Sequence, residues 1–402
     1  MPSSTFSSDA AAAGAAVIAA DGIAIPERFE RPGFVRLTAS DRPGVAQPVP
    51  VRDIPPQPWG RIFIVAVVLA ALLLVGWEAY WRAYGALPTY RNSDGEWAMQ
   101  RRRVDAGEGN KTVLIGSSRV LFDVQLPVWE KLAGERPIQL AMEGTSSVPV
   151  LEDLANDPRF TGRLLVGVAP ELFFSGFALR GNVVKLYHKQ GPSQRIGNWL
   201  SMHLLEPYLA FDGRDFALAT VVRRQAWPLR PGLKPRTDVR ELRVSDFDRN
   251  THMWSKVEND PAYRSLARSI WVEHLSGPPP PNMDTPAKLQ NTIDQQIGRA
   301  VVAVARLRAR GVQVLFVRPP STGPYLAFET QVFPRATTWD VLLKRTGAPG
   351  IHFQDYPQLQ GYDQPEWSHL SASEAQRFSA ALVPLVQREF ERQEARRAIA
   401  TR

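Results

Sequence analysis

The sequence predicts an α/β protein with three layers, α/β/α, in which helices cover both faces of a parallel five-stranded sheet. Short apolar runs with β-branched residues are typical of strands buried on both faces, and they occur at 112–115, 138–142, 164–168, 312–317 and 351–353. Helical stretches separate several of these runs. The clearest is 287–310, where apolar residues recur at helical spacing and Gly311 ends the pattern. Alternation of strand and helix favours parallel strands.

Composition limits the classes of protein to which the chain can belong. Its 402 residues are 44% hydrophobic and 22% charged, enough for one large domain or two ordinary ones. The chain has no cysteine, which excludes disulfides, cysteine nucleophiles and thiolate metal sites. The six histidines are too scattered to suggest a metal site, and we expect neither a metal nor a cofactor.

The net charge of +8 attracts polyanions. It is spread over the whole chain without a recognition motif, so we expect no nucleic-acid partner. We expect the positive charge to attract an acidic polysaccharide or a lipid surface instead.

Residues 1–58 are expected to be disordered, because they combine an Ala/Gly run with many prolines and lack periodicity. An uncharged run then extends from Ile62 to Trp77, and it predicts a transmembrane helix over 60–82. A buried core helix is the alternative, although such a helix rarely lacks a polar stripe. A cleaved signal peptide would begin closer to the N-terminus.

Residues 83–110 are expected to link this helix to a domain at 111–398. Basic residues are more numerous after the apolar run than before it, so charge alone does not place the N-terminus in the cytoplasm. Within the domain, residues 173–286 interrupt the strand pattern for too long to be a loop. We expect a mostly helical insertion or lid there.

Candidate functional residues follow the predicted strands, at the edge where parallel strands end and active sites collect. A serine pair, Ser117 and Ser118, follows the first strand, and His369 follows the fifth. A serine needs a base within hydrogen-bond reach, and usually a carboxylate that orients the base, before it can act as a nucleophile. Glu366 and Asp363 are the two candidate carboxylates.

These motifs resemble those of the SGNH (GDSL-type) hydrolases, a superfamily with a flavodoxin-like sheet. Gly116-Ser117-Ser118 resembles block I, Gly144 resembles the block II glycine, and Glu366-x-x-His369 resembles the Asp-x-x-His of block V. The resemblance implies that Ser118 is the nucleophile, with Ser117 as the alternative, and that His369 is the base. It also implies an oxyanion hole formed by the backbone amides of Ser118 and Gly144.

Two departures from the SGNH pattern bear on activity. Ala169 stands where block III has the asparagine that completes the oxyanion hole, and loss of one such donor can reduce the rate by on the order of a hundredfold. The other departure is Glu366 in place of aspartate. Arg119, Glu171 and Arg318 lie at the same edge, where each could contact substrate or form a structural ion pair.

The membrane-anchored layout resembles that of polysaccharide O-acetylation proteins of the alginate type and of the D-alanyl transfer proteins of teichoic acids. This resemblance implies a bacterial inner-membrane protein with one transmembrane helix and its large domain in the periplasm. It further implies serine acyltransferase or esterase activity on a polysaccharide or cell-envelope glycan, beside a multispanning membrane O-acyltransferase. The alternative is a catalytically degenerate scaffold or glycan-binding partner of such an acyltransferase.

Overall fold

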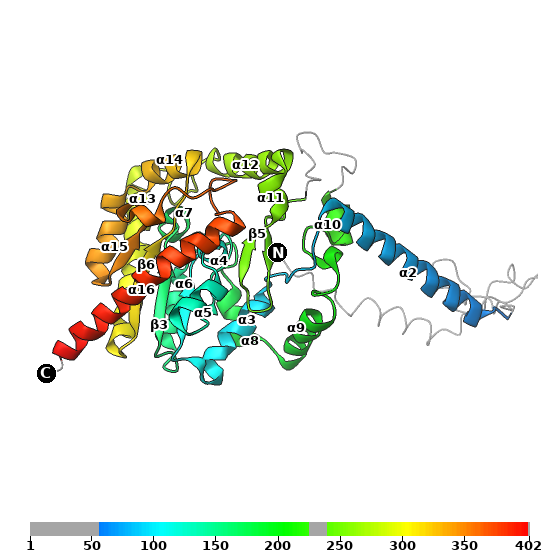
Figure 1. The fold of residues 1–402 in the computed structure, drawn as a ribbon, viewed down its shortest axis with the longest axis horizontal. Coiled ribbons are helices and arrows are strands. Elements are labelled where there is room, and N and C mark those ends of the chain that lie inside the picture. Colours follow the sequence, from blue (N-terminus) through cyan, green and yellow to red (C-terminus); the bar gives the residue numbers. More distant parts are fainter. Residues whose placement is uncertain (1–55, 225–238, 401–402) are drawn as a thin grey trace, which may run out of the picture. The chain divides into compact units, whose positions relative to one another are not determined.

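The computed structural model describes residues 56–224 and 239–400, and it confirms an α/β fold with a parallel sheet (Figure 1). The five strands run in the order β2-β1-β3-β6-β7, and every neighbouring pair is parallel. Their bounds are Thr112–Ile115 for β1, Ile138–Gln139 for β2, Arg163–Gly167 for β3, Gln313–Arg318 for β6 and Gly350–His352 for β7. All five predicted strands are therefore present in one sheet.

Helices connect these strands, and their ends carry the expected signals. Thr285 caps α13 by accepting a hydrogen bond from the Lys288 amide, and Gly311, with φ of 83°, lies just beyond its end. The helices outside the insertion are α3 (Asp94–Arg103), α4 (Ser118–Asp123), α5 (Leu126–Ala133), α6 (Val148–Asn156), α7 (Pro170–Phe173), α13 (Pro286–Ala309), α14 (Gly323–Val332), α15 (Trp339–Thr346) and α16 (Ala372–Ala400).

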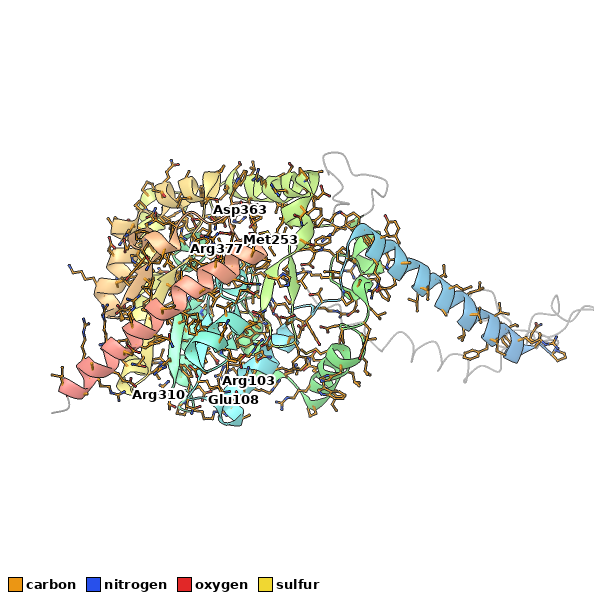
Figure 2. All side chains as sticks on the ribbon, viewed as in Figure 1. Arg103, Glu108, Met253, Arg310, Asp363 and Arg377 are labelled. Atoms are coloured by element: carbon orange, nitrogen blue, oxygen red, sulfur yellow. The ribbon has the colours of Figure 1, made fainter. Side chains whose placement is uncertain are left out.

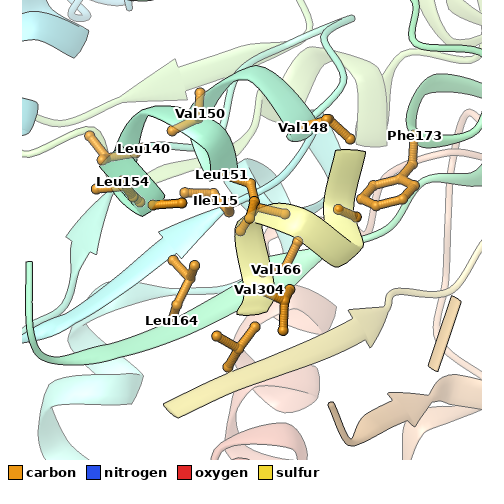
Figure 3. Close-up of a cluster of buried hydrophobic side chains, with 14 of the residues drawn as sticks. Ile115, Leu140, Val148, Val150, Leu151, Leu154, Leu164, Val166, Phe173 and Val304 are labelled. Atoms are coloured by element: carbon orange, nitrogen blue, oxygen red, sulfur yellow. The ribbon is translucent and has the colours of Figure 1, made fainter. Parts of the chain in front are cut away.

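Two buried hydrophobic clusters lie on opposite faces of the sheet. Successive side chains of β1 point to opposite faces of the sheet. Val113 and Ile115 belong to one cluster, and Leu114 belongs to the other. The first contains residues of α6 and α13, and Figure 3 shows Ile115 and Val166 facing Val304 across it. The second contains residues of α4, α5 and α16. Helices therefore pack against both faces of the sheet.

The edge strand β2 is shorter than the predicted run 138–142, and an arginine occupies its outer side. Ladder hydrogen bonds to β1 continue beyond the strand, from the Leu140 amide to Leu114 and from the Met142 amide to Gly116. On the other side, the fully buried Arg249 guanidinium donates to the carbonyls of Gln139 and Ala141, each at 2.7 Å. Arg249 thus satisfies carbonyls that an edge strand would otherwise leave exposed.

Helix α2 (Trp59–Tyr84) is long and apolar enough to cross a membrane, and none of its apolar window is buried. It covers the predicted transmembrane segment 60–82, and its 26 residues exceed the ~20 that a hydrocarbon core requires. The chain divides into two units within this helix, at Leu69 and Ala70. The predicted disordered segment 1–58 lies outside the described residues except for positions 56–58.

The expectation that residues 83–110 form a linker is wrong, because this segment contains α3 and belongs to the domain. Trp97 is fully buried and donates a hydrogen bond to the Leu140 carbonyl. Arg101, also fully buried, is paired with Asp153 and Asp157. A capping box between Ser93 and Glu96 begins the helix. In the sequence alone, the charged residues of this segment resemble a linker. Asp153 and Asp157, which pair with Arg101, lie in a distant segment and are brought to it by the fold.

The described part of the insertion 173–286 is mostly helical, as predicted. It contains α8 (Val183–Lys189), α9 (Pro192–Leu204), α10 (Leu218–Arg224), α11 (Ser255–Asn259) and α12 (Pro261–Leu275). It also contains an antiparallel hairpin that the sequence analysis did not predict, formed by β4 (Arg243–Ser245) and β5 (Thr251–Met253). Arg249, which covers β2, lies in the turn of this hairpin.

Candidate functional site

The serine pair lies where β1 passes into α4. Ser117 is the N-cap residue of α4, and its buried hydroxyl accepts a hydrogen bond from the Arg119 amide at 3.4 Å. Ser118 is the first residue of the helix and is half-buried. Gly116 is required just before them, because a Cβ there would lie 2.6 Å from Val120 and 3.3 Å from the Gly167 backbone. Of the two hydroxyls, that of Ser117 is thus occupied as a helix cap.

His369 and Glu366 form a buried pair in the loop before α16. The His369 Nδ1 atom lies 2.8 Å from Glu366 Oε1, and the His369 backbone amide donates to the same oxygen at 2.6 Å. Trp367 between them adopts φ of 74°, a left-handed conformation that turns the chain so that Glu366 folds back onto His369. Because a carboxylate only accepts hydrogen bonds, this geometry assigns the proton to Nδ1 and leaves Nε2 as an acceptor.

The histidine loop packs along the helix that begins with Ser118. The rings of Phe122 and His369 are stacked with their centroids 4.2 Å apart. One residue farther along both segments, the Leu370 amide donates to Asp123 Oδ1 at 3.0 Å. Ser118 and Phe122 lie on the same face of α4, one turn apart. The stack therefore brings His369 to the face of α4 that carries Ser118.

Burial raises the pKa of Asp123 well above its usual value, because the carboxyl is removed from water. The hydrogen bond from the Leu370 amide opposes this rise in the pKa. Asp123 thus joins α4 to the histidine loop as a buried acid.

Helix α12 of the insertion covers this pair of residues. The Trp271 indole Nε1–H donates to Glu366 Oε2, the carboxylate oxygen that His369 leaves free. Arg268, one turn earlier on α12, donates to the Pro365 carbonyl at 2.8 Å and lies over the Trp367 ring. His369 Nε2 is buried and has no hydrogen-bond partner among the described residues. The hydrogen bond between Ser118 and His369 that the triad requires is therefore not formed in this closed arrangement.

Asp363, the other candidate carboxylate, does not take part in this pairing. Its side chain is exposed in the loop before α16, where Figure 2 labels it. Its backbone carbonyl accepts a hydrogen bond from the Ser371 amide at 3.2 Å. Glu366 is the carboxylate that the structure brings to His369.

Arg119, Glu171 and Arg318 form a buried charged cluster with Glu329, as expected from the alternative in which they make structural ion pairs. Arg119 lies 3.3 Å from Glu171 and 2.7 Å from Glu329, and Arg318 lies 2.7 Å from Glu329. Tyr325 donates to Glu171 at 2.9 Å. All four charged side chains are less than 9% exposed. These contacts join α4, α7, β6 and α14.

The two acids of this cluster titrate in opposite directions. Burial raises the pKa of Glu171, and the neighbouring Glu329 carboxylate raises it further against the opposing effect of Arg119. Arg119 and Arg318 hold the pKa of Glu329 below its usual value. Two adjacent carboxyl groups share one proton more readily than they carry two charges. The cluster is consistent with a protonated Glu171 beside an ionised Glu329.

The two positions expected to bear on the oxyanion hole lie at the same sheet edge. Gly144 follows β2 and adopts φ of 54°, a conformation that favours glycine. Its carbonyl accepts a hydrogen bond from the Leu179 amide, so the first residues of the insertion cover this turn. Ala169 follows β3 as the buried N-cap residue of α7. Its side chain supplies no donor in place of the absent asparagine.

No protein-family model matches the chain, and no curated protein matches it in sequence.

Three participants in the site were not identified from the sequence: Phe122, Asp123 and Trp271. Phe122 and Asp123 lie on α4, about one turn after Ser118. A predicted helix over 118–123 would have shown that they lie near Ser118. Trp271 lies 95 residues before Glu366. Its position in the insertion does not predict a hydrogen bond to Glu366.

Proposed function

We propose that the chain is a membrane-anchored serine acyltransferase or esterase with the three-layer SGNH arrangement. The observation that carries the proposal is the buried Glu366–His369 pair stacked on the helix that begins with Ser118. A histidine held by a carboxylate beside a serine is the combination that acyl transfer requires. The parallel sheet with helices on both faces supports the fold assignment.

The proposed mechanism begins when Ser118 Oγ attacks the carbonyl carbon of an acyl donor and gives its proton to His369 Nε2. Glu366 stabilises the imidazolium that forms. The backbone amides of Ser118 and Gly144 bind the oxyanion. The tetrahedral intermediate then expels the donor's leaving group, which takes the proton from Nε2, and an acyl-serine remains.

The acceptor hydroxyl reverses these steps. It gives its proton to His369 Nε2 as its oxygen attacks the acyl carbon, and Ser118 recovers a proton when the new ester leaves. We propose that the acyl group is acetyl and that the acceptor is an extracytoplasmic polysaccharide or cell-envelope glycan. In this proposal the domain lies in the periplasm of a bacterium, anchored in the inner membrane beside a multispanning O-acyltransferase.

The proposal requires a local opening, because α12 covers the pair and His369 Nε2 has no access to a hydroxyl in the closed arrangement. Rotation of the half-buried Ser118 side chain toward His369, with a shift of α12 that keeps the Trp271–Glu366 hydrogen bond, would supply the missing contact. Loose contacts in unliganded sites that tighten with substrate are common.

The test is turnover of p-nitrophenyl acetate by the full-length protein in detergent, compared with Ser118→Ala and with Ser117→Ala. We expect Ser118→Ala to abolish both turnover and the acetyl-enzyme detectable by intact mass spectrometry. Ser117→Ala should lower stability through the lost cap, by ~1 kcal/mol, and retain the acetyl adduct. Equal turnover by wild type and Ser118→Ala would refute the assignment of the nucleophile.

A second candidate function is a catalytically inactive scaffold or glycan-binding partner. Two observations favour it: Ala169 replaces an oxyanion donor, and the His369 ring is sealed beneath Trp271. In that case neither ester turnover nor an acetyl adduct would appear with any donor. Binding of an acetylated or unmodified glycan would remain, and Ser118→Ala would leave that binding unchanged.

A further inference from the structure

Helix α9 of the insertion presents its apolar side to the solvent. Ile196, Trp199, Leu200 and Leu204 recur at helical spacing on one side of the helix, and they are 59%, 50%, 42% and 59% exposed. The opposite side carries Met202, which is 1% exposed, and Asn198, whose side chain lies against Gly95 of α3. A surface helix of a soluble domain normally buries its apolar side. This inversion indicates that something apolar covers α9.

The segment that follows α9 is bonded to the end of α2, directly after the uncharged run. The Tyr208 carbonyl accepts a hydrogen bond from Arg82 at 2.9 Å. Glu78 accepts from the backbone amides of Ala210 and Phe211 at 3.0 and 3.1 Å. Leu204 precedes Tyr208 by a stretch of chain that can span at most about 14 Å. The apolar side of α9 therefore lies close to the place where α2 leaves its apolar run.

Further exposed apolar side chains and positive charge accompany this helix. Tyr208 is 64% exposed, and Leu218 at the start of α10 is 59% exposed. Residues 183–205 contain Lys185, Lys189 and Arg195, all exposed, and no acidic residue. An exposed apolar stripe flanked by basic side chains is the pattern of a helix that lies in a membrane interface.

We propose that α9 is an interfacial membrane helix, which lies in the headgroup region of an anionic bilayer beside the point where α2 emerges. This inference rests on α2 crossing the membrane and is independent of the proposed acyl transfer. Two facts favour lipid over a protein partner: the stripe lies a few residues from the segment that is bonded to the end of α2, and the exposed charged side chains of α8 and α9 are all positive. Exposed apolar patches of this kind mark membrane or partner contacts.

The absence of cysteine from the chain makes a direct test possible. A nitroxide is attached to the single-cysteine variant Leu200→Cys in the full-length protein, reconstituted into vesicles of phosphatidylethanolamine and phosphatidylglycerol. Power-saturation measurements compare collisions of the label with oxygen, which partitions into lipid, and with a water-soluble nickel chelate. Leu72→Cys in α2 is the membrane control, and Val302→Cys, a 52% exposed position on α13, is the aqueous control.

We expect the oxygen-to-nickel collision ratio at Leu200→Cys to lie several-fold above that at Val302→Cys and below that at Leu72→Cys, which lies deeper in the bilayer. A ratio equal to that of Val302→Cys, with Leu72→Cys in lipid, would overturn the inference. Low collision rates with both reagents at Leu200→Cys would also overturn it, since they indicate burial against a second copy of the chain. An aqueous label at Leu72→Cys would overturn the inference together with the membrane span on which it rests.

Discussion

Replacing Trp271 by phenylalanine tests whether the insertion holds the proposed catalytic pair in place. The indole of Trp271 donates to Glu366, a carboxylate with no exposed surface. Phenylalanine keeps an aromatic ring in this position but removes the donor, so Glu366 Oε2 loses the partner on its side away from His369.

The size of the effect follows from the chemistry of this hydrogen bond. A hydrogen bond to a charged group contributes about 1.5–3 kcal/mol, and we expect Trp271→Phe to lower the free energy of unfolding by this amount. If the bond acts fully on the imidazolium in the transition state, the same energy corresponds to a decrease in kcat of about tenfold to a hundredfold. KM should stay unchanged, because in this mechanism Trp271 contacts Glu366 and not the substrate.

Thermal unfolding and p-nitrophenyl acetate turnover of the full-length protein measure the two effects separately. Trp97→Phe is the matched control. Trp97 is fully buried and donates to a neutral carbonyl, that of Leu140, within the cluster on the other face of the sheet. We expect that variant to lose stability without a change in kcat. If Trp271→Phe retains wild-type kcat and stability, Trp271 does not position Glu366 and the reasoning is wrong.

Three further predictions concern the buried charges and the serine turn. Burial raises the pKa of Glu171, so the folded state holds a proton that the unfolded state releases. The contribution of Glu171 to the free energy of unfolding is therefore full below the unfolded-state pKa. It falls as the pH rises toward the folded-state pKa, by at most about 1.4 kcal/mol per pH unit. Glu171→Gln should flatten this slope in calorimetric scans between acidic and neutral pH, whereas Glu130→Gln, on an exposed side chain, should leave it unchanged. Arg249→Ala should lower the free energy of unfolding in urea by at least about 3 kcal/mol, because three buried acceptors lose their donor; a change as small as that of the exposed Arg377→Ala would contradict this role. Gly116→Ala should cost about 1–3 kcal/mol by forcing a Cβ against Val120, and wild-type stability by urea unfolding would show that the turn has room.

The strands and helix α13 of the domain were predictable because each depends on a local pattern. The strand predicted at 312–317 is apolar except for Gln313, and α13 repeats apolar residues at helical spacing up to Gly311. Helix α3 was missed although its capping box from Ser93 to Glu96 is visible in the sequence. Its charged residues resemble a linker until Asp153 and Asp157 are brought to Arg101 by the fold.

In the candidate site too, contacts between residues close in the sequence were predictable, and contacts between distant segments were not. The pairing of Glu366 with His369 is local and follows from their spacing, whereas the exclusion of Asp363 depends on which carboxylate becomes buried. Ion pairing of Arg119, Glu171 and Arg318 was one of two alternatives left open by the sequence. In the structure, Glu329 of α14 pairs with both arginines, and nothing in the sequence predicted that contact. Trp271 and Arg249 act across the fold on partners that no sequence period connects.

The cover that α12 forms over His369 has a consequence for the fate of an acyl group on Ser118. Water is the most abundant competitor for such an intermediate, and in the proposed mechanism a histidine whose Nε2 is buried activates water only when α12 moves, so that hydrolysis is slow. In the proposed mechanism, an acceptor that shifts α12 while the Trp271–Glu366 hydrogen bond persists would open the base only while that acceptor is bound. If the chain is the acyltransferase that we propose, a closed resting state of this kind would favour donation to a large bound acceptor over loss to water, and it would lengthen the life of the acyl-enzyme when no acceptor is present.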